Sequence, residues 1–252
     1  MDVRGRGAIV AGTRRLGAAV VRRLAGEGVR LAIVHRSPQA QSQAKALARE
    51  VGPWTDKVCV LQADLTVEAQ VRAVVERARQ ELGDLSFSVN LASDYPAGPL
   101  DRLDSTDWDT GLASAKATYL LAVHSARVIR GNAPGPTRGH LVFCGDWAAE
   151  ATPYRGYLPY LTGKAAIHFM TRAFARELAG HGILVNALAP GPTVRPPGLD
   201  EPTWLRVLSS TPLGRSSSAK DMADMVATLL RSETITGEVI RIDSGRHIAG
   251  SP

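Results

Sequence analysis

The chain has 252 residues, of which 44% are hydrophobic and 21% are charged, a composition typical of an ordinary globular protein. The net charge of +6 comes from arginines that are scattered rather than gathered in blocks, which argues against a nucleic-acid-binding stripe and favours attraction of small anions. No apolar run approaches the ~18 residues of a membrane span, and no basic start leads into an apolar segment, so we expect neither a membrane helix nor a signal peptide.

Short apolar runs alternate with amphipathic segments along the whole chain. The predicted strands cover residues 7–11, 29–35, 58–64, 85–90, 141–144, 183–188 and 239–242. The predicted helices cover residues 18–25, 39–50, 67–82, 107–130, 160–179, 204–209 and 219–231. This alternation predicts an α/β fold, a Rossmann-type doubly wound parallel sheet with helices on both faces. We find no domain boundary, so residues 1–252 are expected to form one domain, and the loops near Asn132 and Pro196 are taken as internal.

The stretch from Asp146 to Lys164 carries the strongest chemical signal. It follows a buried apolar run, and it places Tyr160 and Lys164 four residues apart, on one face of a predicted helix. A phenol normally loses its proton near pH ~10, and a nearby ammonium lowers that pKa. A tyrosine in this setting can exchange a proton with a substrate. A surface pair on an ordinary helix would have the same spacing, so the motif needs support from elsewhere in the chain.

That support comes from the N-terminal half. Gly12 and Gly17 enclose a turn between a strand and a helix, where backbone N–H groups suit a pyrophosphate, although a glycine turn without a ligand has the same pattern. The second strand ends in His35-Arg36-Ser37, without the acid that would take the ribose hydroxyls of NAD. Arg36, with Arg14 in the turn, instead favours the 2′-phosphate of NADP(H), the alternative being that Arg36 is simply solvated.

Taken together, these motifs resemble the short-chain dehydrogenase/reductase family over nearly the whole chain. The resemblance rests on the glycine turn and on residues 63–65, 89–93, 160–164, 185–192 and 235–245. It implies that Tyr160 donates the proton and that Lys164 holds the nicotinamide ribose and lowers the tyrosine pKa. The cofactor-binding residues that it implies are Gly12, Arg14, Arg15, Leu16, Gly17, His35, Arg36, Ser37, Asp64, Leu65, Asn90, Ala92, Ser93, Tyr160, Lys164, Pro190, Gly191 and Thr193.

One position points to a branch of this family. Asp146 stands where the family usually has a serine, as in the pteridine reductases, and the basic turn 14–17 and the loop 93–100 are also similar to that branch. The resemblance implies a catalytic group of Asp146, Tyr160 and Lys164, and a substrate loop at about residues 191–216. It implies substrate-binding roles for Arg15, Ser93, Tyr95, Asp146, Trp147 and Trp204.

The aspartate has a chemical rationale. A pterin presents a row of N–H donors and ring nitrogens, and a carboxyl group accepts hydrogen bonds when ionised and donates one when protonated. Asp146 and Tyr160 together would then supply the proton that accompanies hydride transfer from NADPH to a C=N bond. The alternative is that Asp146 is an exposed turn residue in an enzyme that has lost its serine.

The chain also departs from the family pattern. Tyr160 lies one residue farther from Asp146 than in pteridine reductases, and Trp147, Tyr154 and Tyr157 are either pocket walls or packing under a long loop. The remaining departures are Ala11 for the first turn glycine, Leu91 for an asparagine, Ser114 or Ala115 for a helix asparagine, and Ser244 for a glycine. An alanine at position 11 is tolerated if the turn keeps a negative φ there.

Three functions remain open. The first is an NADPH-dependent reductase of a pterin-like or related heterocyclic C=N substrate, the second a ketoreductase for 3-oxoacyl or other carbonyl compounds, and the third a non-catalytic NADP(H)-binding sensor. The six histidines show no metal-ligand spacing, so no metal is expected. Cys59 and Cys144 lie in apolar runs and are expected to be core thiols in a reducing compartment, hence a cytoplasmic protein. The family resemblance implies a homo-oligomer, a dimer or tetramer, that pairs the helices beginning at Asp107 and Tyr160.

Overall fold

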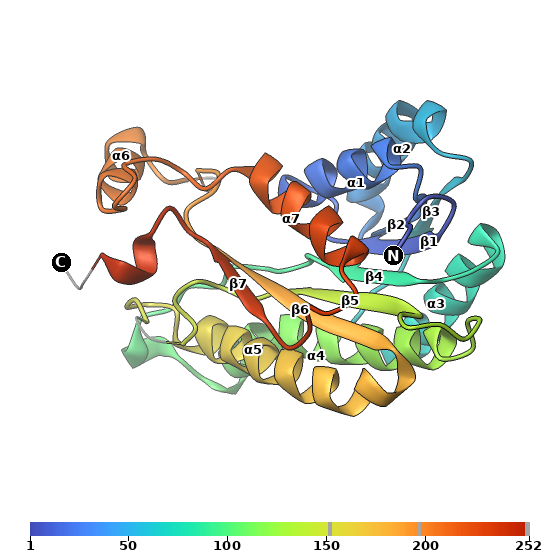
Figure 1. Ribbon diagram of the computed structural model, residues 1–252. Coiled ribbons are helices and arrows are strands. Elements are labelled where there is room, and N and C mark those ends of the chain that lie inside the picture. Colours follow the sequence, from blue (N-terminus) through green and yellow to red (C-terminus); the bar gives the residue numbers. More distant parts are fainter. Residues whose placement is uncertain (151–152, 196–197, 250–252) are drawn as a thin grey trace.

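The computed structural model describes residues 1–150, 153–195 and 198–249, and its centre is a sheet of seven parallel strands in the order β3-β2-β1-β4-β5-β6-β7 (Figure 1). The strands are β1 (Gly7–Ala11), β2 (Arg30–His35), β3 (Val58–Gln62), β4 (Phe87–Asn90), β5 (Gly139–Cys144), β6 (Ile183–Pro190) and β7 (Val239–Ile242). The α-helices are α1 (Leu16–Gly26), α2 (Pro38–Val51), α3 (Glu68–Leu82), α4 (Ser105–Ile129), α5 (Leu158–Leu178), α6 (Glu201–Ser209) and α7 (Ala219–Arg231). The predicted doubly wound α/β fold is confirmed.

Helices cover both faces of the sheet. In Figure 1, α1, α2 and α7 lie on one face and α3, α4 and α5 on the other. Successive residues of β1 serve the two layers in turn: Ala8 and Val10 pack into the core under α1 and α7, and Ile9 and Ala11 pack into the core under α3 and α4. A strand that is buried on both faces has no polar side, which explains the uninterrupted apolar runs in the sequence.

All fourteen predicted elements are present, and the differences lie at their ends. β3 stops at Gln62, two residues before the predicted end, and β6 continues to Pro190, two residues beyond it. Helix α5 starts at Leu158 rather than at Tyr160, with Pro159 in its first turn, where the missing N–H of proline costs nothing. Tyr160 therefore lies inside the helix and not at its start.

The order of the strands sets the position of the site. Consecutive strands move outward in one direction from β1 to β3, and β4 then pairs on the other side of β1, with Ala11 opposite both Val34 and Asn90. Ligands in such sheets bind outside the carboxyl ends of the strands, where the winding direction changes. The loops after β1 to β6 emerge at this edge and carry many of the predicted site residues. Leu16 and Gly17 lie in α1, Tyr160 and Lys164 in α5, and Trp204 in α6. Residues 196 and 197 of the predicted substrate loop lie outside the described residues.

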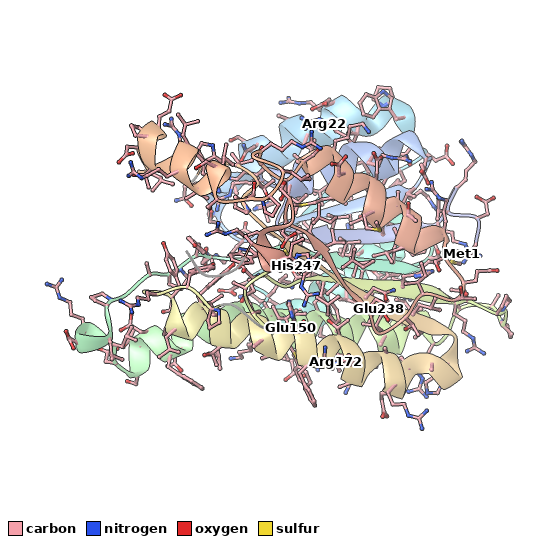
Figure 2. The ribbon with its side chains drawn as sticks, turned by 60° about the vertical axis from the view of Figure 1, so that its left-hand side comes forward. Met1, Arg22, Glu150, Arg172, Glu238 and His247 are labelled. Atoms are coloured by element: carbon pink, nitrogen blue, oxygen red, sulfur yellow. The ribbon has the colours of Figure 1, made fainter. Side chains whose placement is uncertain are left out.

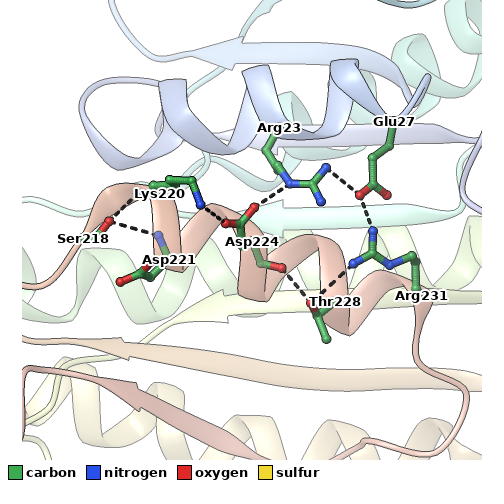
Figure 3. A network of polar contacts seen from close by, with 8 residues as sticks. All are labelled: Arg23, Glu27, Ser218, Lys220, Asp221, Asp224, Thr228 and Arg231. Carbon is green, nitrogen blue, oxygen red and sulfur yellow. Dashed lines mark hydrogen bonds and ion pairs between the residues drawn. The ribbon is translucent and has the colours of Figure 1, made fainter.

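The last helix is fastened to the first by a network of ion pairs (Figure 3). Arg23 of α1 contacts Asp224 of α7 and Glu27 at 2.6 Å each, and Glu27 also meets Arg231 of α7. These side chains are partly exposed, and ion pairs near the surface contribute little to stability because water screens their charges. The apolar contacts beneath them contribute more, because residues such as Leu24 and Val226 are fully buried in the same core.

The two cysteines are both free thiols. Cys144 is buried at the end of β5, as predicted, but Cys59 in β3 is only partly buried. Burial still raises the pKa of the Cys59 thiol to about 11, so little reactive thiolate forms at neutral pH. Within residues 1–150, 153–195 and 198–249, no helix is long and apolar enough to cross a membrane, and no group of three metal-binding side chains comes together.

Candidate active site

The turn after β1 depends on the absence of side chains. Gly12 has φ +80°, and a Cβ added to it would lie 2.3 Å from the backbone nitrogen of Ala92. A Cβ on Gly17 would lie 2.0 Å from the carbonyl oxygen of Gly12. Ala11 keeps a negative φ, which is why alanine replaces the family glycine there without strain. Both predicted turn glycines are therefore required by close backbone approach.

Helix α1 begins directly after this turn with its first N–H groups free of a side-chain cap. Its N-cap residue is Arg15, at φ 51°, and both Arg14 and Arg15 expose their side chains. Gly17 N donates to Arg14 O, and the positive end of the helix dipole with the two guanidinium groups makes this turn suitable for an anion. Leu16 and Gly17 complete the turn that the sequence singled out.

The loops after β2 and β4 are joined by an ion pair. Arg36 Nη1 lies 2.9 Å from Asp94 Oδ2, and the two side chains are 58% and 49% exposed. His35 is buried, with Nδ1 3.0 Å from the carbonyl oxygen of Ser37. The guanidinium of Arg36 is thus paired with Asp94 but remains open to solvent, within reach of a phosphate.

The other predicted cofactor residues lie along the same edge of the sheet. Asp64 accepts hydrogen bonds from Thr66 N and Thr66 Oγ1, and these bonds lower the pKa of its carboxyl group. Asn90 is buried and accepts from Ala92 N while donating to Thr118 Oγ1. The remaining members are Leu65, which is buried, Ser93, which is exposed, Pro190, at the end of β6, and Gly191 and Thr193, which follow it.

Asp146 and Tyr160 form the centre of the site. Tyr160 O–H donates to Asp146 Oδ2 at 2.8 Å, and Ala148 N donates to Asp146 Oδ1 at 2.9 Å. Asp146 is 8% exposed and Tyr160 is 6% exposed, so Asp146 is not the exposed turn residue of the alternative reading. Burial raises the pKa of the Asp146 carboxyl group, although the hydrogen bonds from Ala148 and Tyr160 and the charge of Lys164 act in the opposite direction.

Lys164 lies behind this pair. Its Nζ donates to the carbonyl oxygen of Cys144 at 2.8 Å and is 5.6 Å from the centre of the Tyr160 ring, and its side chain is fully buried. The pKa of Tyr160 itself is raised well above its usual value, first by burial and then by the charge of Asp146 and the hydrogen bond to it. That Lys164 lowers this pKa stays a prediction.

Aromatic side chains surround the Asp146 carboxyl group. Tyr95 stacks on Tyr157 with ring centres 4.3 Å apart and meets the Tyr160 ring edge-on at 4.8 Å, while Trp147 stacks on Tyr154 at 6.1 Å. Tyr95 is nevertheless 48% exposed. The structure shows that these rings pack on one another beside Tyr160, and a role for them as pocket walls stays a prediction.

Trp204 lies apart from this cluster. It belongs to α6, which Figure 1 shows on the α7 side of the sheet, whereas Tyr160 belongs to α5 on the other side. Among the described residues, no aromatic contact joins Trp204 to the rings around Tyr160. The structure thus brings together Tyr95, Trp147, Asp146 and Tyr160, and leaves Trp204 outside the contacts of that group.

Two residues that lie close to Asp146 are not among the predicted catalytic and binding residues, although Tyr154 is one of the aromatics left open between pocket wall and loop packing. Tyr154 O–H is 3.4 Å from the same Oδ2 atom of Asp146, and His168 Nε2 is 3.3 Å from the backbone nitrogen of Asp146. His168 follows Lys164 by four residues, so helix periodicity alone places it on the same face of α5. No comparable signal marks Tyr154, because the loop that carries it has no periodic structure.

Comparisons with known proteins agree with this geometry. The family model described as enoyl-(acyl carrier protein) reductase matches residues 10–247. The chain belongs to the short-chain dehydrogenase/reductase family. The predicted family is therefore confirmed, and the protein is an oxidoreductase of this family.

Three similar proteins illustrate the range within the family. The chain is 29% identical to the short-chain reductase protein NovJ of Streptomyces niveus, over 95% of this chain and 93% of that protein. It is 30% identical to a 3-oxoacyl-[acyl-carrier-protein] reductase of Bos taurus, over 94% and 96%. The crystal structure of FolM alternative dihydrofolate reductase 1 from Brucella canis, complexed with NADP, is 29% identical and superimposes with a TM-score of 0.89 over 100% of this chain and 97% of that one.

Proposed function

We propose that this short-chain reductase uses NADPH to transfer a hydride to a pterin-like or related heterocyclic C=N substrate, with Asp146, Tyr160 and Lys164 as its catalytic group. The observation that carries the proposal is the Tyr160 O–H bond to Asp146 Oδ2 at 2.8 Å, made to a carboxyl group that is 8% exposed. A serine hydroxyl at this position would offer one donor to one carbonyl oxygen. A carboxyl group with a raised pKa offers two oxygens and an exchangeable proton.

The chain's own residues suit the proposed cofactor. The bare N-terminus of α1 with Arg14 and Arg15 would hold the pyrophosphate, and Arg36, at a strand end that has no acid, would meet the 2′-phosphate. The Lys164 ammonium uses one of its three N–H groups on Cys144 O and keeps two for a ribose. When bound, NADPH supplies the hydride, and Tyr160 and Asp146 hold the proton that accompanies it.

The similar structure from Brucella canis supports the substrate class. Its name specifies dihydrofolate reduction and its crystal contains NADP, and dihydrofolate is a pterin derivative. The partly exposed ring of Tyr95, beside Tyr160, provides a flat apolar surface on which a heterocycle can stack. The reductive direction follows from the cofactor, because cells keep the NADP pool largely reduced.

The second candidate is a ketoreductase. It is favoured by the similarity to the bovine 3-oxoacyl-[acyl-carrier-protein] reductase, and the Tyr160 and Lys164 pair suits a carbonyl substrate equally well. In that case Asp146 would be a substitution without a role in the reaction. A non-catalytic NADP(H) sensor would use the same cofactor residues and no proton donor.

Oxidation of NADPH by the purified protein distinguishes these functions. A dihydropterin and a β-ketoacyl thioester are offered in parallel, and turnover of the pterin alone is the expected result. Turnover of the thioester alone would overturn the proposal in favour of the ketoreductase, and tight NADPH binding without turnover of either would favour the sensor. Asp146→Ser provides a second test, because a pterin reductase should lose activity while a ketoreductase should keep or gain it.

We also propose that the protein forms a homo-oligomer through α4 and α5. These helices pack together and expose Trp108, Tyr119 and Phe169, each more than half open to solvent. Large apolar side chains gathered on one face favour burial against another copy. Light scattering after gel filtration should give a mass of two or four chains, and a mass of 26.8 kDa would contradict this proposal.

A further inference from the structure

His168 is a buried histidine that the proposed reaction does not use directly. It lies on α5 and is 1% exposed, and its ring is packed against the end of β5. A Cβ added to Gly145 would lie 2.1 Å from His168 Nε2, so the ring occupies the space that any other residue at position 145 would need. The ring is thus pressed against the backbone that carries Asp146.

The contact with Asp146 fixes the protonation of the ring. Asp146 N donates to His168 Nε2 at 3.3 Å, so this nitrogen must be unprotonated. A neutral imidazole carries one proton, which must then be on Nδ1. His168 Nδ1 lies 3.3 Å from Glu150 Oε1 without the geometry of a hydrogen bond, and it has no hydrogen-bond partner among the described residues. The negative charge of Glu150 beside Nδ1 still favours the proton on this nitrogen.

Glu150 is itself fixed from two elements. It forms an ion pair at 3.3 Å with Arg172, which lies one helical turn after His168 on α5. It forms a second ion pair with Arg241 of β7. Figure 2 shows Glu150 over α5 with Arg172 beside it. Glu150 follows Asp146 by four residues, so the turn is held at its backbone by His168 and at its far end by Glu150.

We propose that His168, oriented by Glu150, is a positioning residue that holds the backbone of Asp146 and so aims its carboxyl group at Tyr160. The inference rests on the proposed role of Asp146 in the reaction, but the contact itself belongs to the protein without substrate. Neither His168 nor Glu150 exchanges a proton with the substrate. Their effect is on geometry, to which reaction rates respond steeply.

The arrangement requires the ring to stay neutral. Burial lowers the pKa of His168, the positive charges of Lys164 and Arg241 act in the same direction, and Glu150 opposes them. Protonation would place an N–H on Nε2, directly opposite the N–H of Asp146, and the hydrogen bond would be lost. In acid we therefore expect the turn to loosen as His168 becomes charged.

Kinetics at pH 7 on the full-length protein form the first part of the test, with NADPH and whichever substrate the parallel assay identifies. His168→Leu should lower kcat about 10- to 100-fold with KM for NADPH within about twofold, because the cofactor residues are untouched. His168→Gln should recover most of this loss, since its carboxamide oxygen can accept from Asp146 N. Thr171→Val is the matched control: Thr171 is a buried residue of the same helix that bonds only to Ile167 O among the described residues.

The pH profile of kcat separates positioning from simple packing. Wild type should lose activity in acid as His168 is protonated, and this acidic limb should be absent in His168→Gln. Glu150→Gln should move the limb to lower pH, because it removes a negative charge that raises the pKa of His168. Equal losses in His168→Leu and His168→Gln, with the limb unchanged, would overturn the proposal.

Nitrogen NMR of histidine-labelled protein decides the tautomer without any turnover. At pH 7 the His168 ring should show an unprotonated Nε2 and a protonated Nδ1, with the signals assigned by their loss in His168→Gln. A proton on Nε2 would overturn the inference even if the protein proves to be a pterin reductase. The expected tautomer together with an inactive protein would leave the contact in place and reject the proposed function.

Discussion

The turn after β1 and the turn after β5 lie at the same edge of the sheet but are built in opposite ways. The first is exposed and is shaped by missing side chains, since Gly12 and Gly17 leave no room for a Cβ. The second is buried and is shaped by side chains, since Asp146 is held by Tyr160, Ala148 and His168. Phosphate binding needs backbone N–H groups open to solvent, whereas proton transfer needs carboxyl and phenol groups withdrawn from it.

Substitutions in the two turns should therefore have different effects. A substitution at a glycine of the first turn should weaken both cofactor binding and the stability of the fold, because it displaces the backbone. Substitutions in the second turn should lower turnover more than they change the fold, because they change single polar atoms and displace no backbone. The following substitutions test this contrast.

Tyr160→Phe should give the largest effect, a fall in kcat of roughly 10³-fold, because it removes the proton donor. Tyr154→Phe is the matched comparison, since its hydroxyl lies 3.4 Å from the same oxygen of Asp146 and not 2.8 Å. We expect at most a ~10-fold loss for this weaker contact. Single-turnover kinetics would measure both losses, with thermal unfolding as a control for folding. A larger loss in Tyr154→Phe than in Tyr160→Phe would mean that Tyr154, and not Tyr160, is the proton donor.

Gly12→Ala should destabilise the fold by about 3 kcal/mol, because the added Cβ meets backbone at a positive φ. It should also abolish measurable NADPH binding. Gly26→Ala, at the end of α1, is the control, because a Cβ there meets nothing within 4 Å. Urea unfolding and fluorescence titration with NADPH are the measurements, and normal NADPH affinity in Gly12→Ala would refute the steric argument.

Asp146→Asn should change the dependence of stability on pH. The raised pKa of Asp146 means that the folded protein keeps a proton that the unfolded chain has released, so ionisation destabilises the fold as pH rises from about 4 through that raised pKa. The variant lacks this ionisation. Its free energy of unfolding relative to wild type should therefore increase between pH 4 and pH 7, as measured by urea titrations, and a constant difference would show that Asp146 does not titrate abnormally.

Ser244→Gly should give the smallest effect. It is the converse of Gly12→Ala, because it introduces a glycine at a positive φ instead of removing one. Ser244 stands at φ 56°, where the family pattern has a glycine, and serine is strained in this region. Glycine should stabilise the fold by about 1 kcal/mol and raise Tm by roughly 2–4 °C. Calorimetry would measure the change in Tm. An unchanged or lower Tm would mean that contacts of the serine side chain offset the strain of its backbone.

Much of this protein follows from local sequence pattern. The apolar runs predict β1 because each residue of the strand is buried on one face or the other, as Ala8 and Ile9 show. Helix periodicity places Tyr160 and Lys164 together, and the absence of an acid after β2 points to NADP(H). These features depend on neighbours a few residues away, which a sequence displays directly.

The tertiary structure decided the rest. Tyr160 meets Asp146 at a sequence separation of 14 residues, and Arg36 meets Asp94 at a separation of 58. Neither separation has a period that predicts contact. The raised pKa of Tyr160 also depends on tertiary packing. A spacing of four residues indicates a nearby ammonium, but the loss of water around the phenol and the approach of Asp146 are properties of the packed molecule.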